Sequence, residues 1–63
     1  MKIKDEITLY KDGNLYTVLI NGWEFIREYF VGYDSEEEIV EIITERIAKH
    51  FGVKPEEVWN QKD

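Results

Sequence analysis

Three glutamates, Glu37, Glu41 and Glu45, are the residues of this sequence that are best spaced to do chemistry together. On a helix, a spacing of four residues places side chains one turn apart on the same face. Neighbouring carboxylates in such a row could share a cation or a proton. Arg46 and Lys49 are interspersed with them, as on the solvated face of an ordinary surface helix. We therefore interpret the glutamates as an acidic surface and expect no metal site.

The other residues that could carry chemistry have structural explanations. The single histidine, His50, falls in the last turn of a predicted helix, where a cation interacts favourably with the helix dipole. The single serine, Ser35, stands where a helix N-cap is expected. No base and orienting acid accompany either residue, as nucleophilic catalysis requires. We expect no catalytic residue and no cofactor, and hence no enzyme.

Length and composition narrow the possible architectures. The chain has 63 residues, no cysteine and a formal net charge of −6. Residues 1–63 can form only one domain, and a domain of this size buries only about 60% of the surface that its unfolded chain exposes. Disulfides and thiolate metal sites are excluded, so stability has to come from efficient packing or from association with another chain.

The charge distribution limits the possible partners. Residues 34–63 carry five of the six net negative charges. Duplex nucleic acid is bound chiefly through Lys and Arg contacts to phosphates, so we expect no duplex nucleic acid as partner. A basic protein surface is compatible with this charge. No apolar run approaches the roughly 20 residues needed to span a bilayer, and we expect a cytoplasmic protein with no membrane contact.

Two turn signals divide the N-terminal half into three runs rich in β-forming residues. Asp12-Gly13 separates residues 7–10 from residues 15–20, and Asn21-Gly22 separates the second run from residues 23–26. Asp-Gly and Asn-Gly favour two-residue hairpin turns because both central residues tolerate positive φ. We therefore predict a three-stranded antiparallel β-meander.

Turns centred on these two pairs define the register of the predicted sheet. The expected cross-strand pairs are Leu9 with Tyr16, Ile7 with Val18, Ile20 with Trp23, and Val18 with Phe25. Because side chains alternate between faces, one face then collects seven mostly apolar residues: Ile7, Leu9, Tyr16, Val18, Ile20, Trp23 and Phe25. A three-residue loop around Gly13 is the alternative, and it would move Ile7 and Leu9 to the opposite face.

The third strand is expected to run to about Val31 and to end at Gly32. Strict alternation along this strand would point Arg27 towards the predicted core. A β-bulge, in which one extra residue is inserted into a strand, would correct this orientation. We therefore expect a bulge near Arg27.

The C-terminal half predicts one amphipathic helix. Ser35 and Glu38 have the spacing of a capping box, and Gly52 is placed to end the helix. The apolar residues between them recur at helical spacing and form one stripe: Ile39, Ile43, Ile47 and Phe51. We expect a core between this stripe and the sheet that contains Val18, Trp23, Phe25, Ile43 and Ile47.

Pro55 opens a short C-terminal segment, residues 55–59. We expect a turn or short helix that folds Val58 and Trp59 over the core, with a brief fourth strand as the alternative. The predicted fold is therefore α+β: a three-stranded antiparallel β-meander followed by one helix packed on one sheet face, in the order βββα.

A single helix leaves the opposite face of the sheet uncovered. In the predicted register this face presents Tyr10, Leu15, Leu19, Ile26 and Phe30, among Glu6, Thr8, Thr17, Glu24 and Glu28. An apolar cluster with a polar rim often marks an interaction site. Scattered exposed apolar residues that merely favour strands are the alternative explanation.

These observations favour a small acidic protein-interaction module. The simplest partner is a second copy of the chain, which would form a homodimer through the uncovered sheet face or an edge strand. The acidic surface of Glu37, Glu41 and Glu45 suggests an alternative, an inhibitor or decoy that binds a basic protein surface. A designed scaffold without a biological function is a further alternative, because local and global sequence signals agree so closely.

Overall fold

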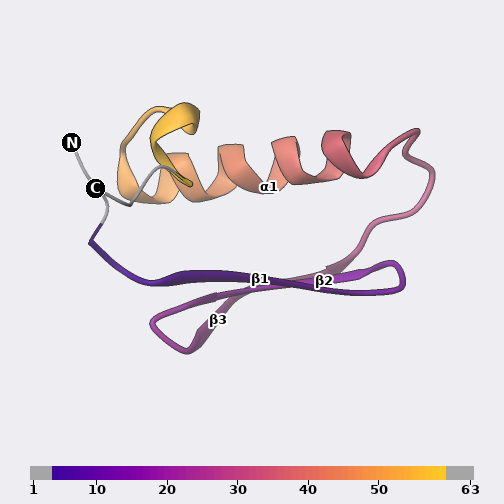
Figure 1. The fold of residues 1–63 in the computed structure, drawn as a ribbon, viewed down its shortest axis with the longest axis horizontal. Coiled ribbons are helices and arrows are strands. Elements are labelled where there is room, and N and C mark those ends of the chain that lie inside the picture. Colours follow the sequence, from indigo (N-terminus) through magenta and orange to yellow (C-terminus); the bar gives the residue numbers. More distant parts are fainter. Residues whose placement is uncertain (1–3, 60–63) are drawn as a thin grey trace.

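The computed structural model of the chain describes residues 4–59 and shows a sheet covered on one side by a helix (Figure 1). The elements are β1 (Ile7–Asp12), β2 (Leu15–Ile20), β3 (Trp23–Tyr29), α1 (Glu36–Phe51) and the short 3₁₀ helix η1 (Pro55–Glu57). The strands are antiparallel neighbours in the order β1-β2-β3. The predicted βββα fold is confirmed, and the C-terminal segment is a short helix, not a strand.

The two hairpin turns place glycine differently: it is the second turn residue in Asn21-Gly22 and the first in Gly13-Asn14. Asn21 and Gly22 both have positive φ, at 54° and 84°, as predicted for this turn. The first turn is centred on Gly13 and Asn14, one residue later than predicted, because Asp12 still pairs with Leu15. Only Gly13 has positive φ there, which is the pattern of a turn that needs glycine at its first central position.

The later turn shifts the pairing of β1 and β2 by two residues. Leu9 faces Val18 and Ile7 faces Ile20, so the predicted pairs of these residues are wrong. A shift of two residues leaves every side chain on its original face, because alternation has a period of two. Ile7 and Leu9 therefore lie on the helix-facing side, as predicted.

The β-bulge lies in β3 at Phe25. Leu19 pairs with Glu24, but the next residue of β2, Val18, pairs with Ile26. The predicted bulge near Arg27 is thus placed two residues too late. From Ile26 onwards the alternation of β3 is reversed relative to the prediction, which turns Arg27 away from the helix.

Capping interactions define α1. The Ser35 hydroxyl accepts a hydrogen bond from the Glu38 backbone N–H at 3.3 Å, and the Glu38 carboxylate accepts one from the Asp34 N–H at 3.2 Å. Gly52 ends the helix in the left-handed conformation, with φ of 72°, and the Val53 N–H donates to the Ala48 carbonyl. The cap residues are those predicted.

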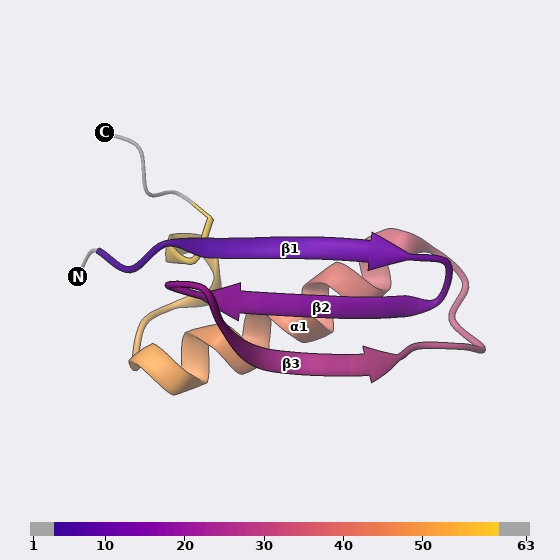
Figure 2. The ribbon, with the colours of Figure 1, turned by 90° about the horizontal axis from the view of Figure 1, so that it is seen from below.

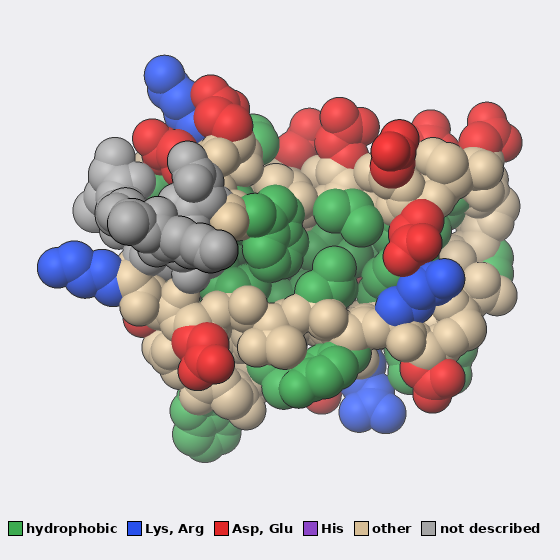
Figure 3. All heavy atoms as spheres, viewed as in Figure 1, with side chains coloured by type: hydrophobic (Ala, Val, Ile, Leu, Met, Phe, Trp, Pro, Cys, Tyr) green, Lys and Arg blue, Asp and Glu red, His purple; other side chains and the backbone are tan. Residues whose placement is uncertain are grey.

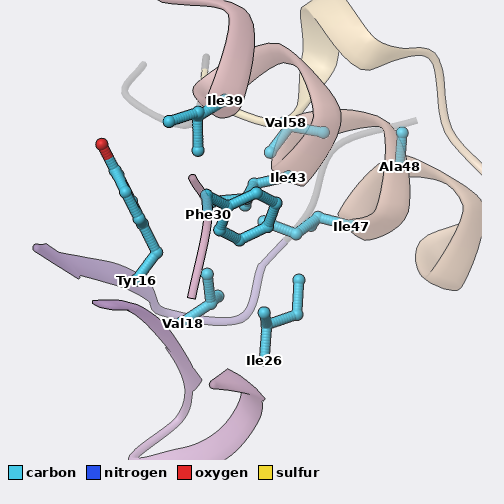
Figure 4. Packing of buried hydrophobic residues seen from close by; sticks show 9 residues of the cluster. All are labelled: Tyr16, Val18, Ile26, Phe30, Ile39, Ile43, Ile47, Ala48 and Val58. Carbon is cyan, nitrogen blue, oxygen red and sulfur yellow. The ribbon is translucent and has the colours of Figure 1, made fainter. Parts of the chain in front are cut away.

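The core lies between the sheet and α1, and nine hydrophobic residues are buried in it (Figure 4). They come from β2, from β3 and the residue after it, from α1, and from the segment after η1: Tyr16, Val18, Ile26, Phe30, Ile39, Ile43, Ile47, Ala48 and Val58. Val18, Ile43 and Ile47 are completely buried, as predicted, and Phe25 packs against this core while half-buried.

Trp23 does not belong to the core, contrary to the prediction, since 80% of it is exposed. The position of Trp23 relative to α1 explains this exposure. The ring of His50, in the penultimate residue of α1, lies 4.8 Å from the ring of Phe25. Trp23 lies two residues before Phe25, at the start of β3, and this end of the strand curves away from α1 (Figure 1).

The segment after α1 completes the cover on the β1 side. In Figure 2, α1 runs obliquely behind the sheet, from the β1 side at its start to the β3 side at its end. Val58 is fully buried. The Trp59 indole N–H donates a 2.7 Å hydrogen bond to the Thr44 hydroxyl, which itself donates to the Val40 carbonyl. The expected folding of Val58 over the core is confirmed, and Trp59 is 41% exposed.

Candidate interaction surface

The face of the sheet opposite α1 is the candidate interaction surface, and we call it the open face. The register places three rows of residues on it, one residue from each strand. The rows consist of Thr8, Leu19 and Glu24; of Tyr10, Thr17 and Arg27; and of Asp12, Leu15 and Tyr29. Of the five residues that the sequence predicts for this surface, the structure brings Tyr10, Leu15 and Leu19 together on it.

Ile26 and Phe30 are not on the open face, and their assignment to it is wrong. Their exposed fractions are 8% and 3%, and both belong to the core cluster. The Phe30 ring packs edge-on against Tyr16, with ring centres 5.5 Å apart. The cause is the bulge at Phe25, which reverses the alternation of β3 after Glu24.

Tyr29 and Arg27 replace them on the open face, and neither residue was predicted for this surface. Tyr29 pairs with Leu15 and is 71% exposed, while Tyr10 on β1 is 56% exposed. A signal for this exchange exists in the sequence. Trp23 and Phe25 are apolar residues at odd positions, whereas Ile26 and Phe30 are apolar residues at even positions, and such a change of phase indicates a bulge between Phe25 and Ile26.

The bulge also changes the charge of the open face. Glu28 turns towards the helix layer and accepts a 2.8 Å hydrogen bond from the Arg46 guanidinium. Arg27 now lies on the open face, 3.7 Å from the Glu24 carboxylate. The three rows of the open face therefore carry both signs of charge: Arg27 is basic, and Glu24 and Asp12 are acidic.

The acidic surface predicted to bind a basic protein lies on α1, on the side of the molecule opposite the open face. Glu37, Glu41 and Glu45 are exposed residues of α1. Glu37 and Glu41 line a shallow groove of about 750 Å³ beside the helix, together with Val40 and Thr44. Glu45 lies outside this groove, so the structure groups only two of the three glutamates.

His50 makes packing contacts with aromatic side chains. Its ring lies between two aromatic rings, 4.8 Å from Phe25 and 4.9 Å from Phe51. Within residues 4–59, no three His, Asp or Glu side chains converge closely enough to hold a metal ion. No helix in this part of the chain combines the length and apolar character needed to cross a membrane.

Comparison of the chain with models of protein families, with curated proteins and with solved structures found no match. Function therefore has to be inferred from the surface of this chain. The fold presents two candidate interaction surfaces. The first is the open face, which α1 does not cover, and the second is the edge of β1 beside the groove of α1.

Proposed function

We propose that the chain is a non-enzymatic, cytoplasmic protein-interaction module that associates with a second copy of itself through the open face. The observation that supports this proposal is the position of Tyr10, Leu15, Leu19 and Tyr29 on a sheet face that α1 does not cover. Burying such side chains contributes about 25 cal/mol for each Å² of apolar surface removed from water.

The charges of the open face favour a copy of the same chain over an oppositely charged partner. In a two-fold symmetric dimer the same surface meets itself, so it has to be self-complementary. Arg27 and Glu24 lie side by side on β3. A two-fold axis parallel to the strands exchanges β1 and β3, and it places each Arg27 opposite Tyr10 of the other copy, one row from its Asp12.

The acidic half of the chain does not oppose this arrangement. Residues 34–63 carry five of the six net negative charges, and α1 lies on the face opposite the open face (Figure 1). In a face-to-face dimer the order of layers is helix, sheet, sheet, helix. With layer spacings of roughly 10 Å, the two helices are about 30 Å apart. This distance exceeds the Debye length of about 10 Å at 0.1 M salt.

The size of the open face limits the affinity. Three strands spaced by about 4.8 Å, each with a rise of about 3.4 Å per residue, give a footprint of roughly 15 Å by 20 Å. Stable protein interfaces are larger than this, and small ones belong to transient complexes. We expect a dissociation constant of about 10–500 µM.

Sedimentation equilibrium up to millimolar concentration tests the proposal. Leu19→Lys introduces a charge on the central strand of the open face without removing a residue of the core cluster. The parent is expected to dimerise and this variant to remain monomeric. Val31→Lys is the matched control, because Val31 is an exposed apolar residue beyond the end of β3, and this variant should still dimerise. A monomeric parent at millimolar concentration would overturn the proposal.

Cross-linking tests the geometry directly, because the chain contains no cysteine. Thr17 lies in the central row of the central strand. In a symmetric dimer Thr17→Cys therefore lies close to its own copy, across a gap of about 10 Å between sheets. A short bismaleimide should link Thr17→Cys into dimers and leave the control Glu45→Cys, on the helix, monomeric. Equal linking of both variants would show random collision.

A further inference from the structure

A second surface, at the free edge of β1, is distinct from the open face. β1 pairs only with β2, so one of its edges lies at the side of the sheet (Figure 2). The Asn21 N–H donates to the Glu6 carbonyl at 2.8 Å, which shows that Glu6 directs its backbone groups towards β2. Backbone groups alternate in direction along an antiparallel strand. Those of Ile7, Leu9 and Lys11 therefore point outwards, away from β2.

An apolar recess accompanies this edge. Figure 3 shows hydrophobic side chains between the sheet and α1 on the side of β1. Ile7 and Leu9 are half-buried and pack against the core from this edge. Val40 and Thr44 line the groove beside the N-terminal half of α1, which starts on the β1 side of the sheet (Figure 2), and Val40 is half-buried. An added strand beside β1 would lie along this recess.

The helix side of the recess is negatively charged. Glu37 and Glu41 form the rim of the groove. Within residues 4–59, neither carboxylate has a Lys or Arg partner at ion-pair distance. Glu36, in contrast, lies 3.8 Å from the Lys11 ammonium group, at the end of β1 nearest the helix N-terminus. Glu37 and Glu41 are therefore two carboxylates beside the recess whose negative charge no basic side chain of residues 4–59 pairs with.

A second copy of the chain fits this edge poorly. Antiparallel pairing of β1 with β1 of another copy would make a continuous sheet with both helices on the same face. The groove rims of the two copies would then face one another, each with Glu37 and Glu41. Like charges brought together in this way oppose association. Because Glu37 and Glu41 are negatively charged, a positively charged partner fits the β1 edge better than a second copy does.

We propose that the β1 edge binds an extended basic peptide segment that presents an apolar side chain and Lys or Arg side chains at every second position, on one face of the strand. This proposal goes beyond self-association and concerns a different surface. The peptide adds a fourth strand and hydrogen bonds to the outward backbone groups of Ile7, Leu9 and Lys11, the mode of recognition known as β-augmentation. An apolar side chain of the peptide packs beside Leu9 on the helix-facing side, and the basic side chains two residues before and after it, on the same side, reach Glu37 and Glu41.

The probe is the acetylated and amidated peptide Thr-Lys-Thr-Val-Thr-Lys-Thr, which presents its valine between two lysines on one face of an added strand. Its binding is measured by ¹⁵N NMR titration of the full chain. Two derivatives carry N-methyl groups, one on the amides of the valine and both lysines and the other on the amides of all threonines. In an added strand only one of these two sets of amides faces β1. We expect one derivative to bind at least tenfold more weakly than the parent peptide and the other to bind within about threefold of it.

The shifts of the protein amides locate the bound peptide. The amides of Ile7, Leu9 and Lys11 should shift and become protected from hydrogen exchange, whereas those of the alternate residues Thr8 and Tyr10, already directed towards β2, should change less. Equal binding of both methylated derivatives, or shifts confined to α1, would mean that the peptide is held by charge alone and would overturn the proposal.

Variants of Lys11 test the role of the backbone. Lys11→Pro removes an outward N–H donor at an exposed position of an edge strand, where proline is tolerated. Lys11→Ala removes the same side chain but keeps the donor. We expect at least tenfold weaker peptide binding for the proline variant and little change for the alanine variant, provided that the circular dichroism spectra of both match the parent. Equal affinities of the two variants would contradict strand addition.

Two more variants separate this surface from the open face. The double variant Glu37→Gln/Glu41→Gln should bind the peptide several-fold more weakly and with a smaller dependence on salt. Leu19→Lys, which is designed to prevent self-association, should bind the peptide as the parent does. Self-association and peptide binding can therefore fail independently. Unchanged affinity in the double variant would refute the role assigned to the two glutamates.

Discussion

Phe25 and Ile26 are adjacent in β3, yet both side chains contact the helix layer. Phe25 packs against His50, and Ile26 is buried in the core cluster. In a regular strand, neighbours point to opposite faces. The bulge allows both residues to bury apolar surface, and it places Glu28 beside Arg46 and Arg27 on the open face.

Ile26→Ala tests this placement at the residue scale. Truncation of a buried Ile typically costs about 2–5 kcal/mol of unfolding free energy. The whole domain is expected to have a stability of only about 3–9 kcal/mol, from typical values per residue. Urea denaturation at low micromolar concentration should therefore show a large loss for Ile26→Ala and a loss below about 0.5 kcal/mol for the exposed control Val31→Ala. Similar losses in both variants would place Ile26 outside the core.

Thr44→Val tests the contact that ties the C-terminal segment to α1. Valine has nearly the same shape as threonine but cannot accept the 2.7 Å hydrogen bond from the Trp59 indole N–H. We expect a loss of about 1 kcal/mol in unfolding free energy. The indole proton of Trp59 should also exchange faster with solvent, as measured by NMR. Slow, unchanged exchange of this proton would contradict the contact.

At the scale of elements, the bulge and the turns position both proposed surfaces. The two-residue shift at Gly13 leaves the faces of β1 unchanged, whereas the single extra residue at Phe25 reverses the faces of β3. The open face therefore depends on β3 far more than on the register of β1. The β1 edge depends on the order of the strands, which leaves β1 outermost.

Single deletions in β3 test the bulge. Deletion of Phe25 removes the extra residue and leaves Ile26 and Phe30 in phase with β2, so this variant should fold and lose mainly the contact with His50. Deletion of Arg27 should instead turn Phe30 out of the core, at a cost of about 3–5 kcal/mol. Thermal melting followed by circular dichroism compares the two. A deletion of Arg27 that melts at or above the temperature of the Phe25 deletion would argue against the bulge at Phe25.

At the scale of the whole molecule, the sheet separates a nearly neutral open face from an acidic helix. The chain carries a net charge of −6, mostly in residues 34–63. Association through the open face therefore keeps the acidic helices far apart. Binding of a basic segment at the β1 edge, in contrast, uses the carboxylates of α1 directly.

Salt should therefore affect the two associations differently. Between about 20 and 300 mM NaCl, peptide binding at the β1 edge should weaken several-fold because added ions screen exposed charges. The dissociation constant of the dimer should change by less than about threefold, because its contacts are mainly apolar. Sedimentation and peptide titration at both salt concentrations measure these effects. A dimer that weakens with salt as strongly as the peptide complex would indicate that charge, and not the open face, drives self-association.

Local interactions explain which parts of this protein could be predicted from its sequence alone. The Asn21-Gly22 turn, the Ser35 cap and the Gly52 cap depend on residues within a few positions of one another. The apolar stripe of α1 has a regular period, so its buried residues Ile43 and Ile47 could be identified as well. From these elements the order βββα and the uncovered sheet face follow.

The change of phase after Phe25 signals a bulge in β3, but only the tertiary structure determined its position and therefore which residues of β3 form that face. A bulge can occupy neighbouring positions with little difference in local preference, and burial against α1 selects the one that places Ile26 and Phe30 inside. The exposure of Trp23 likewise depends on the path of β3, whose start curves away from α1 (Figure 1). The recess beside β1 depends on the oblique path of α1 across the sheet. These features arise from contacts between segments far apart in the chain, whose free energies no short stretch of sequence contains.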